Sequence, residues 1–249
     1  MTLHYRELPD VTGVDLGPLP AAGGFPYWPT VPVVARPLPA DVRPVRHAGY
    51  LRRGKRVLDI VLSLAALILA APVLVLLAAA LWIESGNPFY TQERLGQNGR
   101  RFRMFKLRTM VIDAETHLAA CLDRDPAMRA EWELTQKLKR DPRITPIGRL
   151  LRKTSMDELP QLFNVLKGDM SMVGPRPMLP EQLPLYAHPD AYLTMRPGVT
   201  GLWQVTARNE QSFALRATLD LRYAQRVSLG MDLRLILATL AVVFRATGY

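Results

Sequence analysis

The feature of this sequence that most constrains the fold is a long apolar run near residue 70. It extends from Ile60 to Ile83, and Ser63 and Pro72 are its two interruptions. Its 24 residues are enough for a helix to cross a hydrocarbon core of about 30 Å. We therefore expect part of this chain to fold in contact with lipid.

Proline and charge decide how that run meets a membrane. Pro72 should kink the helix near its middle, leaving arms of about 25 and 18 Å, each shorter than the hydrocarbon core. Both flanks are basic, and short basic flanks favour the cytoplasmic side. We therefore predict a re-entrant membrane helix over residues 49–86, broken at Pro72, with both ends cytoplasmic. The run alone leaves open an ordinary transmembrane helix with a proline kink. The basic flanks are Arg43, Arg46, Arg52, Arg53, Lys55 and Arg56 before the run and Arg94, Arg100, Arg101, Arg103, Lys106 and Arg108 after it.

The sequence before the run differs in composition. Residues 1–48 contain nine prolines and four glycines, which disfavour regular helix. We expect a Pro-rich extended tail, although Phe25, Tyr27 and Trp28 leave open a strap lying on the folded part. Inside the run, Asp59 needs a partner, and Arg56 or another basic residue is the candidate.

Periodicity over residues 87–249 predicts several helices and one short strand. The stretch RFRMFKL alternates apolar and basic residues, as a strand does. The apolar segment 231–245 is too short to span, and we favour an interfacial helix over a buried core helix. Further helices are expected within 113–139, interrupted near Asp125-Pro126, and over 147–153 and 211–226.

Two adjacent carboxylates, Asp157 and Glu158, precede Pro160. Because proline is accepted in the first turn of a helix, we expect Asp157 to be the N-cap of a helix that ends at Gly168. Capping alone would explain a lone acidic pair. Here arginines surround the pair, and both a helix start and an arginine fork bind phosphate. The basic neighbours are Arg149, Arg152, Lys153 and Arg176.

These residue types favour phosphoryl transfer. A carboxylate can attack phosphorus as a nucleophile, and a phosphate beside two carboxylates calls for a hard cation such as Mg²⁺. We therefore expect Asp157 and Glu158 to be both the catalytic residues and the metal ligands. The net charge of +10 also indicates an anionic partner. The single cysteine, Cys121, excludes an intrachain disulfide, and no P-loop, GxGxxG, GxSxG or HExxH motif competes.

From about Gly54 to Tyr249 the sequence resembles the bacterial sugar transferases, the small monotopic phosphoglycosyl transferases. The resemblance rests on KRVLD, FRMFKLRTM, RPGVTGLWQV and the long stretch DPRITPIGRLLRKTSMDELPQLFNVLKGDMSMVGPRP. The chain departs from the usual pattern at Ala71, Leu107 and Met156, where serine, phenylalanine and leucine are common. None of these departures touches the acidic pair or the arginines.

The resemblance implies a compact α/β catalytic domain, mainly helical with a small sheet, over residues 87–249. This monotopic domain would lie at the cytoplasmic face of the bacterial inner membrane. It implies that Asp157 attacks the sugar-bearing phosphate of a UDP-sugar and expels UMP, and that undecaprenyl phosphate then takes the phospho-sugar. Glu158 and Mg²⁺ would assist. Such a reaction starts a membrane glycoconjugate: an exopolysaccharide, a capsule, an O-antigen or a glycoprotein glycan. Anionic membrane lipids are further expected partners and nucleic acid is not, whereas a homo-oligomer is left open.

Other candidate residues have weaker support. Lys106 and Arg108 could hold substrate phosphate or meet lipid headgroups. Arg196 and Gln204 lie in a Gly-Pro loop that is equally explained as a structural turn. The full set of expected phosphate-binding residues is Lys106, Arg108, Arg149, Arg152, Arg176, Arg196 and Gln204.

Two other functions compete with transfer to a lipid. A membrane-anchored basic module that binds anionic lipid or nucleic acid would explain the charge and the apolar run, but not the acidic pair among arginines. A membrane phosphohydrolase would use the same aspartyl phosphate with water as the acceptor. The sequence does not identify the sugar.

Overall fold

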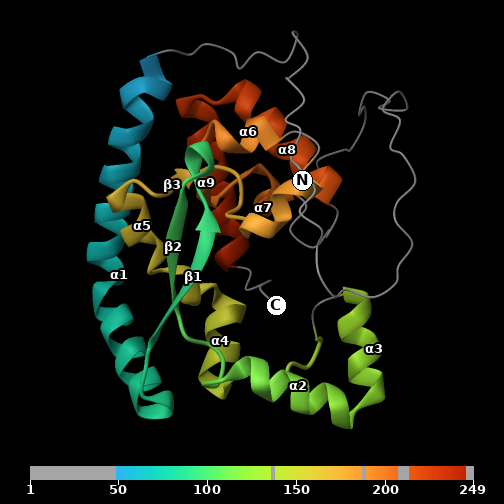
Figure 1. The fold of residues 1–249 in the computed structure, drawn as a ribbon. Coiled ribbons are helices and arrows are strands. Elements are labelled where there is room, and N and C mark those ends of the chain that lie inside the picture. Colours follow the sequence, from blue (N-terminus) through green and yellow to red (C-terminus); the bar gives the residue numbers. More distant parts are fainter. Residues whose placement is uncertain (1–48, 136–137, 187–188, 207–212, 245–249) are drawn as a thin grey trace. The chain divides into compact units, whose positions relative to one another are not determined.

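The computed structural model describes residues 49–135, 138–186, 189–206 and 213–244. These residues are mostly helical, with two small two-stranded sheets (Figure 1). This agrees with the expected mainly helical fold, whereas the Pro-rich tail lies outside the described residues. The elements are η1 Tyr50–Gly54, α1 Lys55–Ser85, β1 Phe89–Leu95, η2 Gln97–Gly99, β2 Arg101–Leu107, α2 Ala114–Arg124, α3 Pro126–Thr135, α4 Pro146–Thr154, η3 Met156–Glu158, α5 Gln161–Lys167, β3 Ser171–Val173, η4 Pro180–Leu185, α6 Pro189–Leu193, β4 Gly198–Thr200, α7 Leu202–Thr206, α8 Phe213–Arg226 and α9 Leu229–Phe244.

The apolar run forms the long helix α1, which continues through Pro72 and ends at Gly86 in the left-handed conformation. Among the described residues, α1 is the helix long and apolar enough to cross a membrane, and 11% of its most apolar stretch is buried. Leu69, Leu76 and Ile83 are among its strongly exposed side chains. This surface is compatible with association with a membrane. The change of direction at Pro72 stays a prediction.

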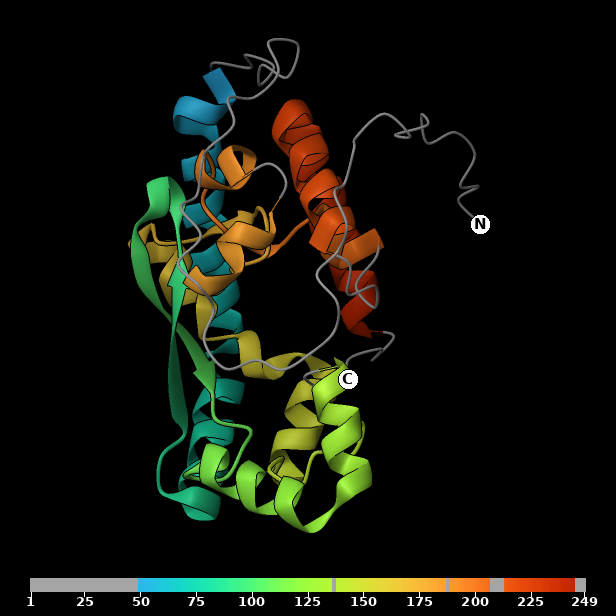
Figure 2. The same ribbon diagram turned by 45° about the vertical axis from the view of Figure 1, so that its right-hand side comes forward.

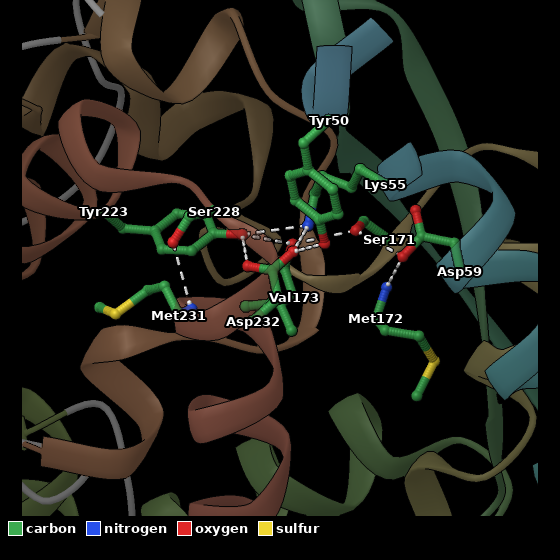
Figure 3. A network of polar contacts seen from close by, with 10 residues as sticks. All are labelled: Tyr50, Lys55, Asp59, Ser171, Met172, Val173, Tyr223, Ser228, Met231 and Asp232. Atoms are coloured by element: carbon green, nitrogen blue, oxygen red, sulfur yellow. Dashed lines mark hydrogen bonds and ion pairs between the residues drawn. The ribbon is translucent and has the colours of Figure 1, made fainter. Parts of the chain in front are cut away.

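A network of polar side chains fixes the amino-terminal end of α1 to the rest of the protein (Figure 3). Lys55 forms an ion pair with Asp232 of α9 at 2.6 Å, and the Tyr50 hydroxyl donates to the same carboxylate at 2.6 Å. One oxygen of Asp59 accepts hydrogen bonds from the Ser171 hydroxyl and the Met172 N–H at 2.9 and 2.8 Å.

Arg56 is therefore not the hydrogen-bonding partner of Asp59. Its guanidinium instead donates to the carbonyls of Val165 and Leu166 in the last turn of α5, at 2.6 and 2.7 Å. The Val165 carbonyl also accepts from the N–H of Gly168, the C-cap, at 3.0 Å. A cation at the carboxyl-terminal end of a helix is favourable. Hydroxyl and backbone donors from β3 occupy one oxygen of Asp59, whereas its other oxygen is buried without a hydrogen-bond partner. Arg56 caps α5 instead.

The strand predicted for RFRMFKL is β2, which pairs with β1 in an antiparallel hairpin. Phe102 and Met104 point from β2 into a core cluster with Val165 of α5 and Met170. The second sheet pairs β3 with β4 in parallel. The backbone next to this sheet is closely packed at Gly174. A Cβ at that position would lie 2.3 Å from the Arg196 carbonyl oxygen, so glycine is required there.

The remaining predicted helices are confirmed in type. The charged segment forms α2 and α3, which meet at Asp125-Pro126, and α4 and α8 cover the basic and carboxyl-terminal helices. The segment 231–245 lies mostly within α9, whose Leu235 is buried whereas Leu233 and Leu237 are exposed. Figure 2 shows α9 running behind α8, and α9 also packs against α7. One face of α9 therefore packs in the core, and the interfacial role of its exposed face remains a prediction.

Candidate functional site: an acidic pair held against Lys106 and Arg152

The acidic pair lies in a tight turn between two helices. Helix α4 ends at Ser155, whose φ of 57° and ψ of 19° place it in the left-handed region. Met156–Glu158 then form the 3-10 turn η3, and α5 begins after Pro160. Left-handed backbone is unfavourable for serine, and such conformations are retained mainly where the surroundings require them. Here it reverses the chain so that the two acids follow directly after α4.

The expected N-cap role of Asp157 is wrong. Pro160 occupies the N-cap position of α5, and no side-chain hydrogen bond caps that helix. The first turn of a helix accepts proline, but this does not require the acid before the proline to be the N-cap. The prediction therefore placed the start of α5 three residues too early. The stop at Gly168 is confirmed, with φ of 88°. Since Asp157 does not cap α5, its burial needs another explanation.

Lys106 of β2 lies against both carboxylates. Its Nζ is 2.9 Å from Oε1 of Glu158 and 3.8 Å from Oδ2 of Asp157. The Glu158 contact is a hydrogen bond, whereas the Asp157 contact is an ion pair beyond hydrogen-bond distance. The Asp157 side chain is 12% exposed and that of Glu158 is 26% exposed. Asp157 is thus the less exposed of the two acids, and Lys106 makes no hydrogen bond to its carboxylate.

Arg152 approaches Asp157 from α4. Its Nε donates to the Thr109 hydroxyl at 2.9 Å, which holds the guanidinium half-buried. Helix α4 lies directly on the Thr109 backbone because Gly148 has no side chain: a Cβ there would be 2.1 Å from the Thr109 carbonyl oxygen. The close approach of helix and strand end thus brings Arg152 to the acidic pair.

The electrostatics of Asp157 are those of a buried acid between opposing charges. Burial raises the pKa of its carboxyl above the ordinary 3.8, and Glu158 adds to the rise, whereas Lys106 and Arg152 lower it. The pKa of Arg152 is lowered mainly by burial, with the charge of Asp157 acting against that change. The charges of Asp157 and Arg152 therefore interact. Carboxyls with shifted pKa values at partly open sites are candidates for function.

Asn164 aligns α5 with β2, and sequence reasoning missed it. Its side chain is fully buried, accepts from the Phe105 N–H at 2.9 Å and donates to the Arg103 carbonyl at 2.7 Å. Asn164 lies on the inner face of an amphipathic segment, and a buried amide there must find hydrogen-bonding partners. This was the sequence signal that could have predicted its role.

The structure separates the other predicted residues. Arg149 is exposed on α4. Arg108 donates to the carbonyls of Asn87 and Phe89 at 3.0 and 3.2 Å, holding the connection between α1 and β1. Arg196 lines an open pocket of about 190 Å³ with Arg100, Asp169 and residues 96–98 at the hairpin turn. Lys106 is five residues along β2 from that turn, roughly 17 Å at strand spacing.

Arg176 and Gln204 lie elsewhere again. The Arg176 guanidinium is 5.8 Å from the ring centre of Trp203, next to Gln204 on α7. Among the sequence-predicted residues, Lys106 and Arg152 are thus the two that the interactions described above join directly to the acidic pair.

The acidic pair supplies carboxylate oxygens, the donor type that Mg²⁺ prefers, and neither thiolate nor imidazole, which zinc sites use. Within the described ranges, no group of three or more His, Cys, Asp or Glu side chains gathers to hold a metal. Mg²⁺ usually takes one or two carboxylates, and water and substrate phosphates complete its shell. The adjacent carboxylates of Asp157 and Glu158 fit that requirement in number and donor type.

The sequence profile described as bacterial sugar transferase matches residues 50–246. The chain belongs to the bacterial sugar transferase family. It is 46% identical over 195 residues to an undecaprenyl-phosphate galactose phosphotransferase of Salmonella typhimurium, covering 78% of this chain and 41% of that protein. An uncharacterized sugar transferase of Haemophilus influenzae is 47% identical with the same coverage.

A relative of similar length widens the comparison. The exopolysaccharide production protein ExoY of Sinorhizobium fredii is 39% identical over 213 residues, which are 85% of this chain and 93% of that protein. By contrast, the chain spans about two fifths of the length of the Salmonella and Haemophilus sugar transferases. The sugar transferase segment is therefore the part that all these proteins share.

Proposed function

We propose that this chain is a phosphoglycosyl transferase that moves a sugar-1-phosphate from a UDP-sugar to undecaprenyl phosphate and releases UMP. The observation that carries the proposal is the buried carboxylate of Asp157, placed beside Glu158 and between the cations Lys106 and Arg152. The name of the Salmonella relative, an undecaprenyl-phosphate galactose phosphotransferase, supports the lipid acceptor. The product would start a membrane glycoconjugate such as an exopolysaccharide.

In the first half-reaction an oxygen of Asp157 attacks the sugar-bearing phosphorus of the UDP-sugar. A bond forms between the carboxylate oxygen and phosphorus, and the bond from that phosphorus to the bridging oxygen breaks. UMP leaves with the bonding electron pair, and the phospho-sugar stays on Asp157 as an acyl phosphate. Lys106 and Arg152 reduce the repulsion between the attacking carboxylate and the anionic substrate.

In the second half-reaction a phosphate oxygen of undecaprenyl phosphate attacks the same phosphorus. The acyl phosphate bond breaks, Asp157 recovers its carboxylate, and the lipid carries a diphosphate-linked sugar. Exclusion of water matters here, because water as the acceptor would hydrolyse the intermediate. The burial of Asp157 and the apolar side chains Met156 and Phe163, exposed nearby in the sequence, suit a lipid acceptor better than a freely wetted site.

Asp157 and Glu158 are the residues that would hold Mg²⁺. The ion would neutralise charge on the diphosphate when bound. Glu158 lies against Lys106 at 2.9 Å, so it also holds this lysine beside Asp157. We place the catalytic domain on the cytoplasmic face of the bacterial inner membrane, where a soluble nucleotide sugar and a lipid phosphate can both reach it.

The deciding experiment measures UMP release from a panel of UDP-sugars with protein in detergent or nanodiscs. With a cognate UDP-sugar and no lipid, about one UMP per active site should appear in a burst, because the reaction has two steps. Addition of undecaprenyl phosphate should restart turnover. Continued UMP release without lipid would indicate a phosphohydrolase. No release with any UDP-sugar, under conditions where the protein is folded, would refute the proposal.

A further inference from the structure

Arg152 is within electrostatic reach of two acids, Asp157 of the acidic pair and the buried Asp141. Burial lowers the pKa of Arg152, whereas the charges of Asp157 and Asp141 both raise it. Among the described residues, Arg152 forms a close ion pair with neither acid. The direction of its guanidinium therefore depends on the other groups that contact it and on what occupies Asp141.

Thr109 holds one nitrogen of the Arg152 guanidinium. The Arg152 Nε donates to the Thr109 hydroxyl at 2.9 Å, and Thr109 is 7% exposed. With the described residues, the terminal nitrogens Nη1 and Nη2 of Arg152 make no hydrogen bond. A planar fork that is held at Nε and open at its end is suited to phosphate oxygens.

Arg143 occupies the competing acid. Its Nε and Nη2 donate to the two oxygens of Asp141 at 2.8 and 2.6 Å, and its backbone N–H donates to the same carboxylate at 3.0 Å. The side chains of this pair are 10% and 7% exposed. The ring centre of Trp132 on α3 lies 5.2 Å from the Arg143 guanidinium carbon. This bidentate pair leaves Asp141 little capacity for a second arginine.

Arg152 is the other cation that acts on Asp141. Burial raises the pKa of Asp141, but its bonds to Arg143 outweigh burial and lower the pKa, and the charge of Arg152 adds to that lowering. A buried carboxylate that loses its partner is strongly unfavourable. Without Arg143, Asp141 would therefore attract Arg152 away from Asp157.

Thr109 and Arg143 come from two backbone segments, 109–111 and 143–145, that pair with each other. The Val111 N–H donates to the Arg143 carbonyl at 2.9 Å, and the Thr145 N–H donates to the Thr109 carbonyl at 3.1 Å. Thr145 is also the N-cap of α4, the helix that carries Arg152. One short paired unit thus fixes Arg152, the hydroxyl that holds it and the arginine that protects it from Asp141.

We propose that Thr109 and Arg143 are positioning residues for Arg152. Thr109 fixes Nε, and Arg143 occupies Asp141, so that the terminal nitrogens of Arg152 stay available beside Asp157 for the sugar-bearing phosphate. This inference rests on the proposed function for the identity of the group that Arg152 binds.

The first test measures the UMP burst with the full chain in nanodiscs and a cognate UDP-sugar. Thr109→Val removes the hydroxyl with little change of shape, and we expect the burst rate to fall about tenfold, as loss of a hydrogen bond to a charged group predicts. Thr109→Ser keeps the hydroxyl and should stay within about twofold of wild type. Thr116→Val, at an exposed threonine of α2, is the matched control. Equal bursts from the Val and Ser variants at position 109 would overturn the role of the hydroxyl.

A double-mutant cycle separates positioning from folding. In an Arg152→Gln background, Thr109→Val should change the burst by less than about twofold, because the guanidinium that Thr109 holds is absent. An undiminished loss in that background would show that Thr109 acts independently of Arg152.

The role of Arg143 is tested by rescue. Arg143→Met should weaken the burst because it leaves Asp141 to compete for Arg152. Adding Asp141→Asn removes the competing charge, and the double variant should return to within about threefold of wild type. Chemical denaturation reports whether each variant is folded. A folded double variant that stays at a tenth of wild-type activity or below would contradict the inference, even where Arg143→Met alone does not fold.

A measurement without substrate keeps this inference distinct from the proposed function. In protein labelled with ¹⁵N-arginine, the Nε–H signal of Arg152 is assigned by its loss in Arg152→Gln. Its exchange with water should be slow in wild type and Thr109→Ser and faster in Thr109→Val. Equal exchange in all three would overturn the inference. If exchange depends on the hydroxyl but no UDP-sugar gives a burst, the hold of Thr109 on Arg152 stands and the proposed function fails.

Discussion

The side chain of Asn164 pairs with the backbone of Phe105 as a neighbouring strand would. Its Oδ1 accepts the Phe105 N–H at 2.9 Å, while its Nδ2 donates to the carbonyl of Arg103 at 2.7 Å. The edge of β2 that β1 leaves uncovered is thereby attached to α5. Lys106 follows Phe105 directly, and Glu158 precedes α5, so this one amide aligns the lysine with the acid.

Replacing Asn164 with Ala should destabilise the fold and weaken catalysis together. The change removes the partner of a partly buried N–H and of a partly buried carbonyl, at a cost of up to about 1–3 kcal/mol for each group. Chemical denaturation of the solubilised protein measures the loss, and the UMP burst measures catalysis. The control is Asn87→Ala, because Asn87 accepts the Phe89 N–H at an exposed site. Equal effects of the two changes would contradict the alignment role.

Asp157→Asn should abolish turnover and leave the fold intact. The amide retains the shape of the carboxylate but cannot form the acyl phosphate, and Asp157 caps no helix. UMP release should fall to background, and a phospho-sugar adduct on residue 157, present in a quenched digest of the wild type, should be absent by mass spectrometry. Asp123→Asn, at an exposed acid, should behave as wild type. Near-normal turnover of Asp157→Asn would exclude it as the nucleophile.

The pH dependence of the burst should respond oppositely to the two neighbours of Asp157. Asp157 attacks as a carboxylate, so the rate is lost as the pH falls through its pKa, which burial and Glu158 raise above 3.8. Glu158→Gln removes a charge that raises this pKa, and the acid limb should move to lower pH. Lys106→Met removes a charge that lowers it, and the limb should move to higher pH. Shifts in the same direction would show that another group titrates.

Arg152→Ala should impair the enzyme more than Arg149→Ala. Arg152 is held half-buried beside Asp157, whereas Arg149 is exposed on the same helix. Loss of a charged hydrogen bond to substrate phosphate costs about 1.5–3 kcal/mol, or roughly 10- to 150-fold in kcat/KM. Steady-state kinetics with the cognate UDP-sugar provide the comparison. Changes below about twofold in both variants would place both arginines outside the site.

Both flanks of α1 should lie on the same side of the membrane. Single cysteines at Val45 and Asn98, each in a Cys121→Ser background, should react with a membrane-impermeant maleimide from the cytoplasmic side. The reason is the basic charge on both flanks of a run that Pro72 should bend. Replacing Ala71-Pro72 with Leu-Leu should shift the chain toward spanning. Reaction from opposite sides in the wild type would establish a transmembrane helix.

Local pattern was sufficient for much of the fold. The alternation in RFRMFKL identified β2, and proline and glycine marked the division between α2 and α3 and the end of α5. The turn at Ser155 was not foreseen, because serine in the left-handed region has no composition signal. After this turn, Asp157 lies in η3, and α5 begins only at Gln161.

The candidate site was predicted in part for the same reason. Asp157 and Glu158 are neighbours in sequence, and Arg152 lies five residues before Asp157. These three residues are therefore close in the chain. The contact of Lys106 with Glu158 spans 52 residues, and it depends on how α5 docks on β2. The contact of Arg176 with Trp203 requires the Pro-Arg-Pro loop and α7 to meet, which no periodicity in a single segment encodes.

The two hydrogen bonds from Arg56 to the last turn of α5 have a mechanical consequence. One end of α5 is fixed to α1, and the acidic pair immediately precedes the other end, only seven residues away. A displacement of α1 along its own axis must therefore carry the acidic pair with it. If α1 lies in a membrane, its depth would then set the height of Asp157 above the acyl chains, and bilayer thickness would affect how readily the carboxylate and a lipid phosphate meet.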